Sequence, residues 1–126
     1  MPRTRVVLFR ASDGRIPVRE WLDELGRRDR RALAKCVDRV ERLAALGYEL
    51  RRPEADHLRD GIFELRVRRG HVNYRLLYFF HGRDAVVLAH ALTKEDVVPA
   101  ADIRCAQERR RLVAANPSTH LHGSHR

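Results

Sequence analysis

The sequence predicts an α+β fold, and three features of the chain predict it. Two consecutive segments repeat apolar residues every three or four positions, as amphipathic helices do. Three apolar segments follow, separated by short turns, which is typical of an antiparallel meander. The length of 126 residues suits one hydrophobic core, which we expect to span residues 1–115. Residues 116–126 have no apolar pattern, and we expect them to form a disordered tail.

The first predicted elements are a strand and a pair of helices. Residues 6–9 form a short apolar, β-branched run that predicts a strand. Pro17 suits the first turn of a helix that Gly26 is placed to end. Asp29 can cap a longer second helix that Gly47 ends. The predicted apolar stripe of the second helix contains Leu33, Cys36, Val37, Val40, Leu43 and Leu46. Its opposite face is basic and either is simply solvated or follows a phosphate backbone.

The predicted meander follows a polar, aperiodic segment at residues 50–60, which we expect to be a loop. Its strands are residues 62–69, 72–80 and 85–92. Apolar and charged residues alternate along the first strand, so one face belongs to the core and the other is charged. Pro99 then precedes a last helix at residues 100–115, with Ile103, Ala106 and Val113 near one face.

The charge of the chain favours a polyanionic partner. Lys and Arg number 26 against 17 Asp and Glu, which gives a net charge of +9. Most of the cations are arginines, whose planar group suits phosphate, so nucleic acid is the expected partner. The sequence has neither a signal-peptide core nor a membrane span, and we expect a cytoplasmic protein. No cofactor motif is present, and Cys36 and Cys105 lack the spacing of a zinc site, so we interpret both as small core residues and expect no metal or cofactor.

The arginines of the meander are the main candidate site. Arg66 and Arg68 project from one strand, and Arg75 lies on the neighbouring strand across a tight turn. If the three share a face, their guanidinium groups converge on an anion site. The alternative is that Glu64 and other carboxylates neutralise them without any ligand.

Several groups able to move protons lie near these arginines in the predicted sheet. Tyr78 and His90 are the acid–base candidates, and Lys94 follows the last strand. The alternative for Tyr78 is a core aromatic, and for His90 a hydrogen-bonded core histidine.

Two motifs in the meander resemble a known family. Residues 58–66 read LRDGIFELR and residues 74–80 read YRLLYFF, in the order and spacing of the phage-derived HigB-like branch of the RelE/ParE toxin superfamily. The resemblance implies a RelE-like fold and a ribosome-dependent mRNA endonuclease that needs no metal. It also implies a small helix-turn-helix antitoxin as a protein partner. In such enzymes the ribose 2′-hydroxyl attacks the adjacent phosphate of the mRNA.

Carried over by position, the resemblance implies that Arg66 and Arg75 hold the scissile phosphate. Arg68 would add charge, Lys94 would contact phosphate or assist proton transfer, and Tyr78 or His90 would serve as the acid–base group. The chain departs from the family pattern at two places where relatives commonly carry lysine. One is Glu95, after the last strand, and the other is the loop before the strand at residues 62–69, which has Asp56 and His57. His57 is a possible substitute base. Two other functions stay open, a ParE-like inhibitor of gyrase and a non-catalytic module that binds nucleic acid or an antitoxin.

Overall fold

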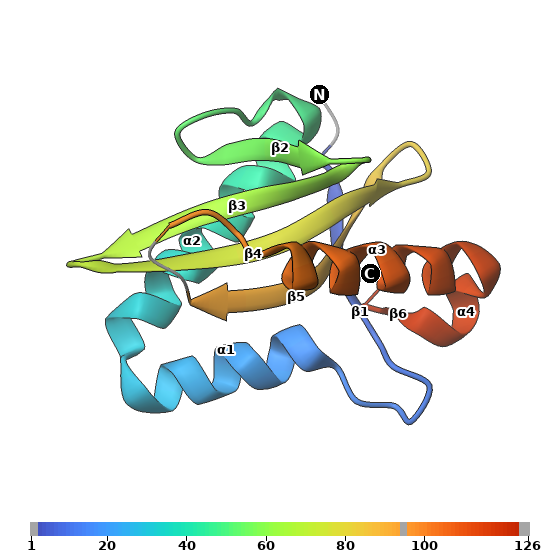
Figure 1. Cartoon of the computed structure of the whole chain (residues 1–126), viewed down its shortest axis with the longest axis horizontal. Helices are drawn as coiled ribbons and strands as arrows, with labels where there is room; N and C mark the ends of the chain where they lie inside the picture. Colours follow the sequence, from blue (N-terminus) through green and yellow to red (C-terminus); the bar gives the residue numbers. More distant parts are fainter. Residues whose placement is uncertain (1–2, 94–95, 124–126) are drawn as a thin grey trace.

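A computed structural model describes residues 3–93 and 96–123, which form one six-stranded sheet with helices on both faces (Figure 1). The strands are β1 (Arg5–Phe9), β2 (Ala55–Arg59), β3 (Ile62–Arg69), β4 (Val72–His81), β5 (Ala85–Thr93) and β6 (Leu121–His122). The helices are α1 (Pro17–Arg28), α2 (Arg30–Leu46), α3 (Ala100–Ala115) and α4 (Pro117–His120), with a 3-10 turn η1 (Gly47–Glu49). The predicted α+β class and the order of its main elements are confirmed.

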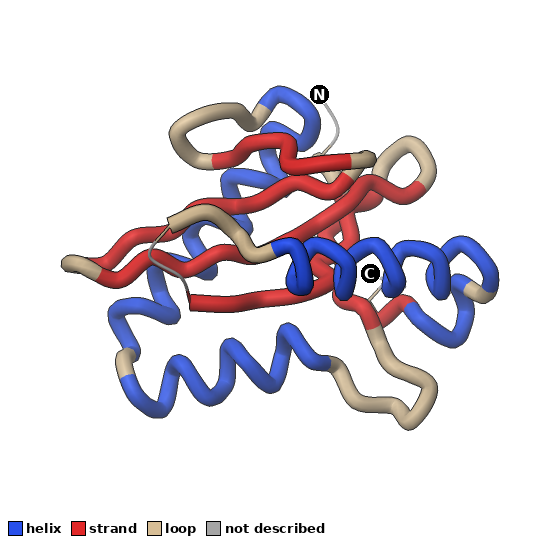
Figure 2. Tube along the Cα trace, viewed as in Figure 1, coloured by secondary structure: helices blue, strands red, loops and turns tan. Residues whose placement is uncertain are grey.

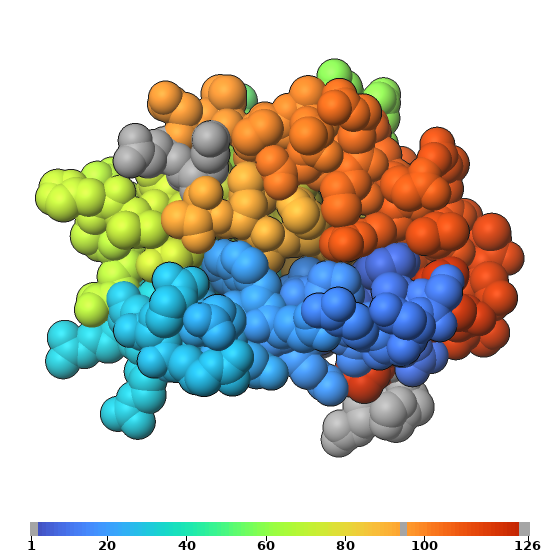
Figure 3. All heavy atoms as spheres, turned by 60° about the horizontal axis from the view of Figure 1, so that its bottom comes forward, coloured from blue at the N-terminus to red at the C-terminus, as the bar shows by residue number. Residues whose placement is uncertain are grey.

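The sheet separates two layers of core. Helices α1 and α2 cover one face and α3 the other (Figure 2). The space-filling view shows α1 in blue and α3 in orange on either side of the gold β5 (Figure 3). The α3 side contains the predicted apolar residues of that helix, Ile103, Ala106 and Val113. In the described ranges, no helix has the length and apolarity that a bilayer span requires.

The strand order is β2-β3-β4-β5-β1-β6. Strands β3, β4 and β5 form the predicted antiparallel meander. The sequence left the place of the first strand open, and the structure places it beside β5 in parallel, with Arg5 opposite Ala85. A parallel neighbour requires a long connection, and here the connection from β1 to β5 contains α1, α2 and the strands β2, β3 and β4.

The loop predicted at residues 50–60 is wrong in its second half, which is strand β2. Asp56 pairs with Glu64 and His57 with Phe63, so β2 extends the meander by one edge strand. Only Ala55 of this strand is buried. An edge strand stabilised mainly by backbone hydrogen bonds leaves little hydrophobic pattern in the sequence, which is why it was missed.

The helix pair differs from the prediction at two places. Helix α1 continues past Gly26 to Arg28, because Gly26 serves the close approach of the two helices; a Cβ there would lie 2.7 Å from Leu33 Cδ2. Val37, predicted to lie in the core, is 48% exposed. Cys36 and Leu43 are buried as predicted, together with Ala32 and Ala44, and Leu33, Val40 and Leu46 are half-buried.

The predicted disordered tail is also wrong for residues 116–123, which form α4 and β6. Asn116 caps α4 by accepting a hydrogen bond from the Thr119 backbone N–H. His120 is buried, stacks on Phe9 at a centroid distance of 5.4 Å, and its Nδ1 lies 2.7 Å from the Arg10 carbonyl oxygen. One buried histidine and a two-residue strand hold this segment, and neither produces an apolar periodicity.

We therefore expect His120→Ala to lower the free energy of unfolding by roughly 1–3 kcal/mol, because it removes a buried ring and a buried hydrogen bond. Denaturant unfolding measures this change. Ser118→Ala, at an exposed position of the same helix, is the control and is expected to have little effect. Equal stability of the wild type and His120→Ala would show that the tail is not anchored by this residue.

Candidate functional site

The β3–β4 register brings the two principal arginines together. Arg66 lies directly opposite Arg75, and Glu64 lies opposite Leu77. Directly opposed residues of an antiparallel pair share a face, so both guanidinium groups lie on the α3 side of the sheet. The convergence on which the anion site depends is therefore present.

The carboxylate of Glu64 lies between these arginines. Its Oε2 is 2.8 Å from both Nε and Nη2 of Arg66, and its Oε1 is 2.9 Å from Arg75 Nε. The contact with Arg75 lacks hydrogen-bond alignment, so the buried Nε of Arg75 has an ion-pair partner but no hydrogen-bond partner. Glu64 is only 4% exposed. It offsets part of the charge and fixes both arginine side chains, as the alternative interpretation required, but one carboxylate does not neutralise two guanidinium groups.

A second carboxylate approaches from the edge strand. Asp56 Oδ2 lies 3.4 Å from Arg66 Nη2 and 3.0 Å from Arg52 Nε. Because Asp56 is shared between two arginines, it adds no net negative charge to the pair. The cluster of Arg52, Asp56, Glu64, Arg66 and Arg75 therefore has a net positive charge.

The arginine pair adjoins an open groove along the outer half of β3, where β2 has ended. The groove has a volume of about 480 Å³, within the range of roughly 300–1,000 Å³ typical of ligand sites. It is lined by Arg39, Pro53, Glu54, Arg66, Val67, Arg68, Asn73 and Arg75. Four arginines and one carboxylate give this groove an excess of positive charge, which suits an anion.

Basic residues of α2 border the same edge. Lys35 Nζ donates to the Arg68 carbonyl oxygen at 3.0 Å, and Arg39 donates to that of Arg66. Arg42 pairs with Glu54 at 2.7 Å. These three members of the basic face are thus neither simply solvated nor free for a phosphate backbone, because they contact the edge of β3 and the loop before β2.

His90 reaches the same face through a β-bulge in β5. Leu77 pairs with His90 and the next residue, Tyr78, pairs with Leu88, so Ala89 is the extra residue. Leu88 packs on the α1–α2 side, whereas His90 contacts Asp102 of α3. Without the bulge, His90 would share a face with Leu88. Arg75 pairs with Leu92, which makes His90 a diagonal neighbour of Arg75, at a typical Cα separation of about 7–8 Å.

Two residues of α3 hold the His90 ring. Its Nε2 lies 2.6 Å from Asp102 Oδ1, and its Nδ1 lies 3.7 Å from Cys105 Sγ. Burial lowers the pKa of His90, but the hydrogen bonds with Cys105 and Asp102 outweigh it, so the pKa lies above the ordinary value. His90 therefore keeps its proton to a higher pH than a free histidine does, which suits a general acid.

The prediction that Tyr78 is an acid–base group is wrong. Tyr78 is 1% exposed and packs among the apolar residues of the α1–α2 side, across the sheet from the arginine pair. Burial, with a smaller contribution from the charge of Glu64, raises the pKa of Tyr78 well above its ordinary value. It is the core aromatic of the alternative interpretation.

The other predicted residues divide as follows. His57 pairs with Phe63 on the face away from the arginine pair, and its Nε2 accepts a hydrogen bond from the Gly61 N–H at 3.1 Å, so it does not serve as a base there. Arg68 lines the groove, with its Nε donating to the Gly70 carbonyl oxygen. Lys94 and Glu95 lie outside the described residues.

Sequence reasoning missed Asp102 and assigned Cys105 to the core, whereas Cys105 is partly exposed beside His90. Their spacing of three residues places both on one face of α3, which the sequence does indicate. Which strand residue they meet depends on the bulge, which the sequence does not indicate. In the described ranges, no group of three or more histidine, cysteine and carboxylate side chains is arranged to hold a metal.

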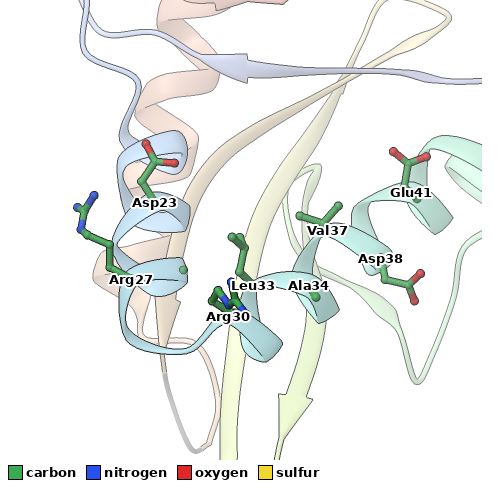
Figure 4. Close-up of a pocket in the computed structure, with 9 residues that line it drawn as sticks. Asp23, Arg27, Arg30, Leu33, Ala34, Val37, Asp38 and Glu41 are labelled. Atoms are coloured by element: carbon green, nitrogen blue, oxygen red, sulfur yellow. The ribbon is translucent and has the colours of Figure 1, made fainter.

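A larger cavity lies elsewhere, between α1 and α2 (Figure 4). It has a volume of about 660 Å³ and is lined by Asp23, Gly26, Arg27, Arg30, Leu33, Ala34, Val37, Asp38 and Glu41. None of the candidate site residues contributes to it, so size alone does not identify the site.

Comparison with known families adds to this geometry. Residues 20–111 match the model of the family described as phage-derived protein Gp49-like (DUF891). The chain belongs to the Gp49-like family. This family is part of the RelE/HigB-like group of toxins, while assignment to the HigB branch itself stays a prediction. The matched region contains Glu64, Arg66, Arg75, His90 and Asp102 but neither β1 nor the tail. No curated protein matches the chain.

The two cysteines of this Gp49-like protein should differ in reactivity. Burial raises the pKa of Cys36 to about 11, whereas the hydrogen bond with His90 lowers the pKa of Cys105 despite partial burial. We expect iodoacetamide to alkylate Cys105 in the native protein and Cys36 only after unfolding. The rate at Cys105 should rise with pH to half its maximum below the pH usual for a thiol. Mass spectrometry of the labelled peptides measures both, and faster native labelling of Cys36 would contradict the arrangement.

Glu64→Gln tests the anion site directly. Removing the buried charge leaves two guanidinium groups unbalanced, so we expect stability to fall by roughly 3–5 kcal/mol. Inorganic phosphate should then stabilise the variant more than the wild type, because an anion replaces the lost carboxylate. Thermal unfolding with and without phosphate measures this difference. Glu24→Gln, at an exposed ion pair with Arg27, is the control, and an equal effect of phosphate on Glu64→Gln and the wild type would contradict the site.

Proposed function

We propose that this protein is the toxin of a toxin–antitoxin pair and cuts mRNA on the ribosome, in the cytoplasm. The observation that supports this most is the pairing of Arg66 with Arg75 on one face, beside an open cationic groove. Two guanidinium groups in this arrangement suit a phosphodiester, which accepts several charge-assisted hydrogen bonds. Family membership supports the role as a toxin, and the proposed regulator is a small helix-turn-helix antitoxin.

The proposed reaction is an attack within the RNA chain. The 2′-oxygen of a ribose gives its proton to a solvent water and forms a bond to the adjacent phosphorus, and the bond from phosphorus to the 5′-oxygen breaks. The leaving oxygen takes up a proton. The products are a 2′,3′-cyclic phosphate and a 5′-hydroxyl end, and no atom comes from a cofactor.

Charge stabilisation and protonation of the leaving oxygen are each assigned to residues of the site. Arg66 and Arg75 stabilise the charge that develops on the phosphorane, and Glu64 positions them. His90 gives a proton to the leaving oxygen, and Asp102 positions its ring. Arg68 and, by the family resemblance, Lys94 contact neighbouring phosphates. Because the acid must be protonated, we expect the cleavage rate to fall as pH rises through the pKa of His90.

The test is to map mRNA 5′ ends in cells after induction of the wild type and variants. Arg66→Ala and Arg75→Ala should each lower cleavage inside translated codons by about 10²–10³-fold. His90→Ala should lower it by about 10²–10⁴-fold. Arg75→Lys keeps the charge but loses the planar fork, so partial activity is expected.

Arg28→Ala is the matched control, because Arg28 lies on α1 and pairs with Glu24 in an exposed position. It should cut like the wild type. Intact mRNA in toxic cells, together with inhibition of gyrase, would overturn the proposal. Undiminished cleavage by Arg75→Ala would show that the site is wrongly assigned.

A further inference from the structure

An exposed aromatic ring lies where α2 ends. Tyr48, in η1, is 63% exposed although it is a large apolar side chain. One face of its ring stacks on Phe80, with the centroids 3.6 Å apart and the planes 15° from parallel. The ring is therefore held flat on the sheet, and its other surface is available to a planar ligand.

A pocket of about 540 Å³ lies beside this ring. Phe63 and His57 form part of its wall, with their rings 5.0 Å apart and at 69°. His57 is oriented by the Gly61 N–H, which donates to its Nε2. In the neutral ring the hydrogen is then on Nδ1, which makes His57 a fixed donor. Aromatic rings and one oriented donor suit a planar group with acceptor atoms.

The rim of this pocket is cationic and adjoins the arginine pair. Arg51 and Arg52 both line the pocket and are exposed. Arg52 and Arg66 approach the same oxygen of Asp56, at 3.0 and 3.4 Å. His57 of the pocket and Asp56 of the arginine cluster are neighbours on β2, and successive side chains of a strand point to opposite faces. A strand bound at the pocket would therefore reach the arginine pair by passing over this edge of the sheet.

We propose that the pocket formed by Tyr48, Arg51, Arg52, His57 and Phe63 binds an unpaired nucleobase of single-stranded RNA. A base stacks on aromatic rings at this kind of site, while arginines at the rim contact its phosphates. The basic rim and the half-polar lining favour a nucleotide over an apolar protein segment. The inference rests on the proposed function only in taking RNA as the ligand, and it adds a second subsite outside the arginine groove.

The test is the equilibrium binding of a short RNA that is 2′-O-methylated, so that it cannot be cut. Fluorescence anisotropy at low ionic strength compares this RNA with the same strand carrying abasic positions. Tyr48→Ala should bind the intact strand about tenfold or more weakly, because it loses one base stack. Tyr48→Phe should bind like the wild type. The abasic strand should bind the wild type and Tyr48→Ala equally.

Val37→Ala is the matched control, since Val37 is an exposed apolar residue of α2 that lines the other cavity. It should leave binding unchanged. The proposal would be overturned if Tyr48→Ala bound the intact strand as tightly as the wild type does. It would also be overturned if the wild type did not bind the intact strand. Capture of a protein that depends on Tyr48, without any effect on RNA, would also overturn it.

Failure of the nuclease proposal is a separate outcome. Intact mRNA in cells together with a tenfold effect of Tyr48→Ala on RNA binding would leave the base pocket standing. Cleavage lost in Arg75→Ala, with no effect of Tyr48→Ala on binding, would leave the nuclease standing and remove the pocket.

Discussion

The ion-paired carboxylate of Glu64 is the interaction on which the site depends. Two guanidinium groups on adjacent strands repel each other, and a buried negative charge between them allows the strands to pair in this register. The same carboxylate leaves the pair with excess positive charge, because Asp56 is divided between Arg66 and Arg52. Glu64 thereby stabilises the fold without neutralising the two arginines, and it holds their side chains in place before any ligand binds.

The edges of the sheet explain where the groove lies. Strand β2 covers only the first half of β3, and on the second half Lys35 and Arg39 donate to carbonyl oxygens that a further strand would otherwise pair. Long basic side chains therefore satisfy the edge and discourage pairing with another chain. They also bring positive charge to the place where β3 is open, so the residues that protect the edge also raise the positive charge beside the groove.

The meander and the helix pair can be predicted from the sequence. The pairing of Arg66 with Arg75 can be predicted too, because alternation along β3 and a tight turn fix the register. It does not reveal the bulge at Ala89, and regular alternation would place His90 with Leu88 in the core. Strand β2 was missed because backbone pairing holds it, and the tail was missed because a single buried histidine and a two-residue strand hold it. Tyr78 was misassigned because an aromatic residue of a central strand has the same pattern whichever helix layer covers it.

The position of β1 has a consequence for how the chain reaches its final form. This strand is flanked by residues from the far end of the chain, with Arg5 beside Ala85 and Leu8 beside His122. Strand β1 therefore gains both neighbours only once the segments of β5 and β6 are in place, and contacts so distant in sequence slow folding. Until then the apolar run of β1 has unpaired edges, and an unpaired apolar strand can pair with another chain.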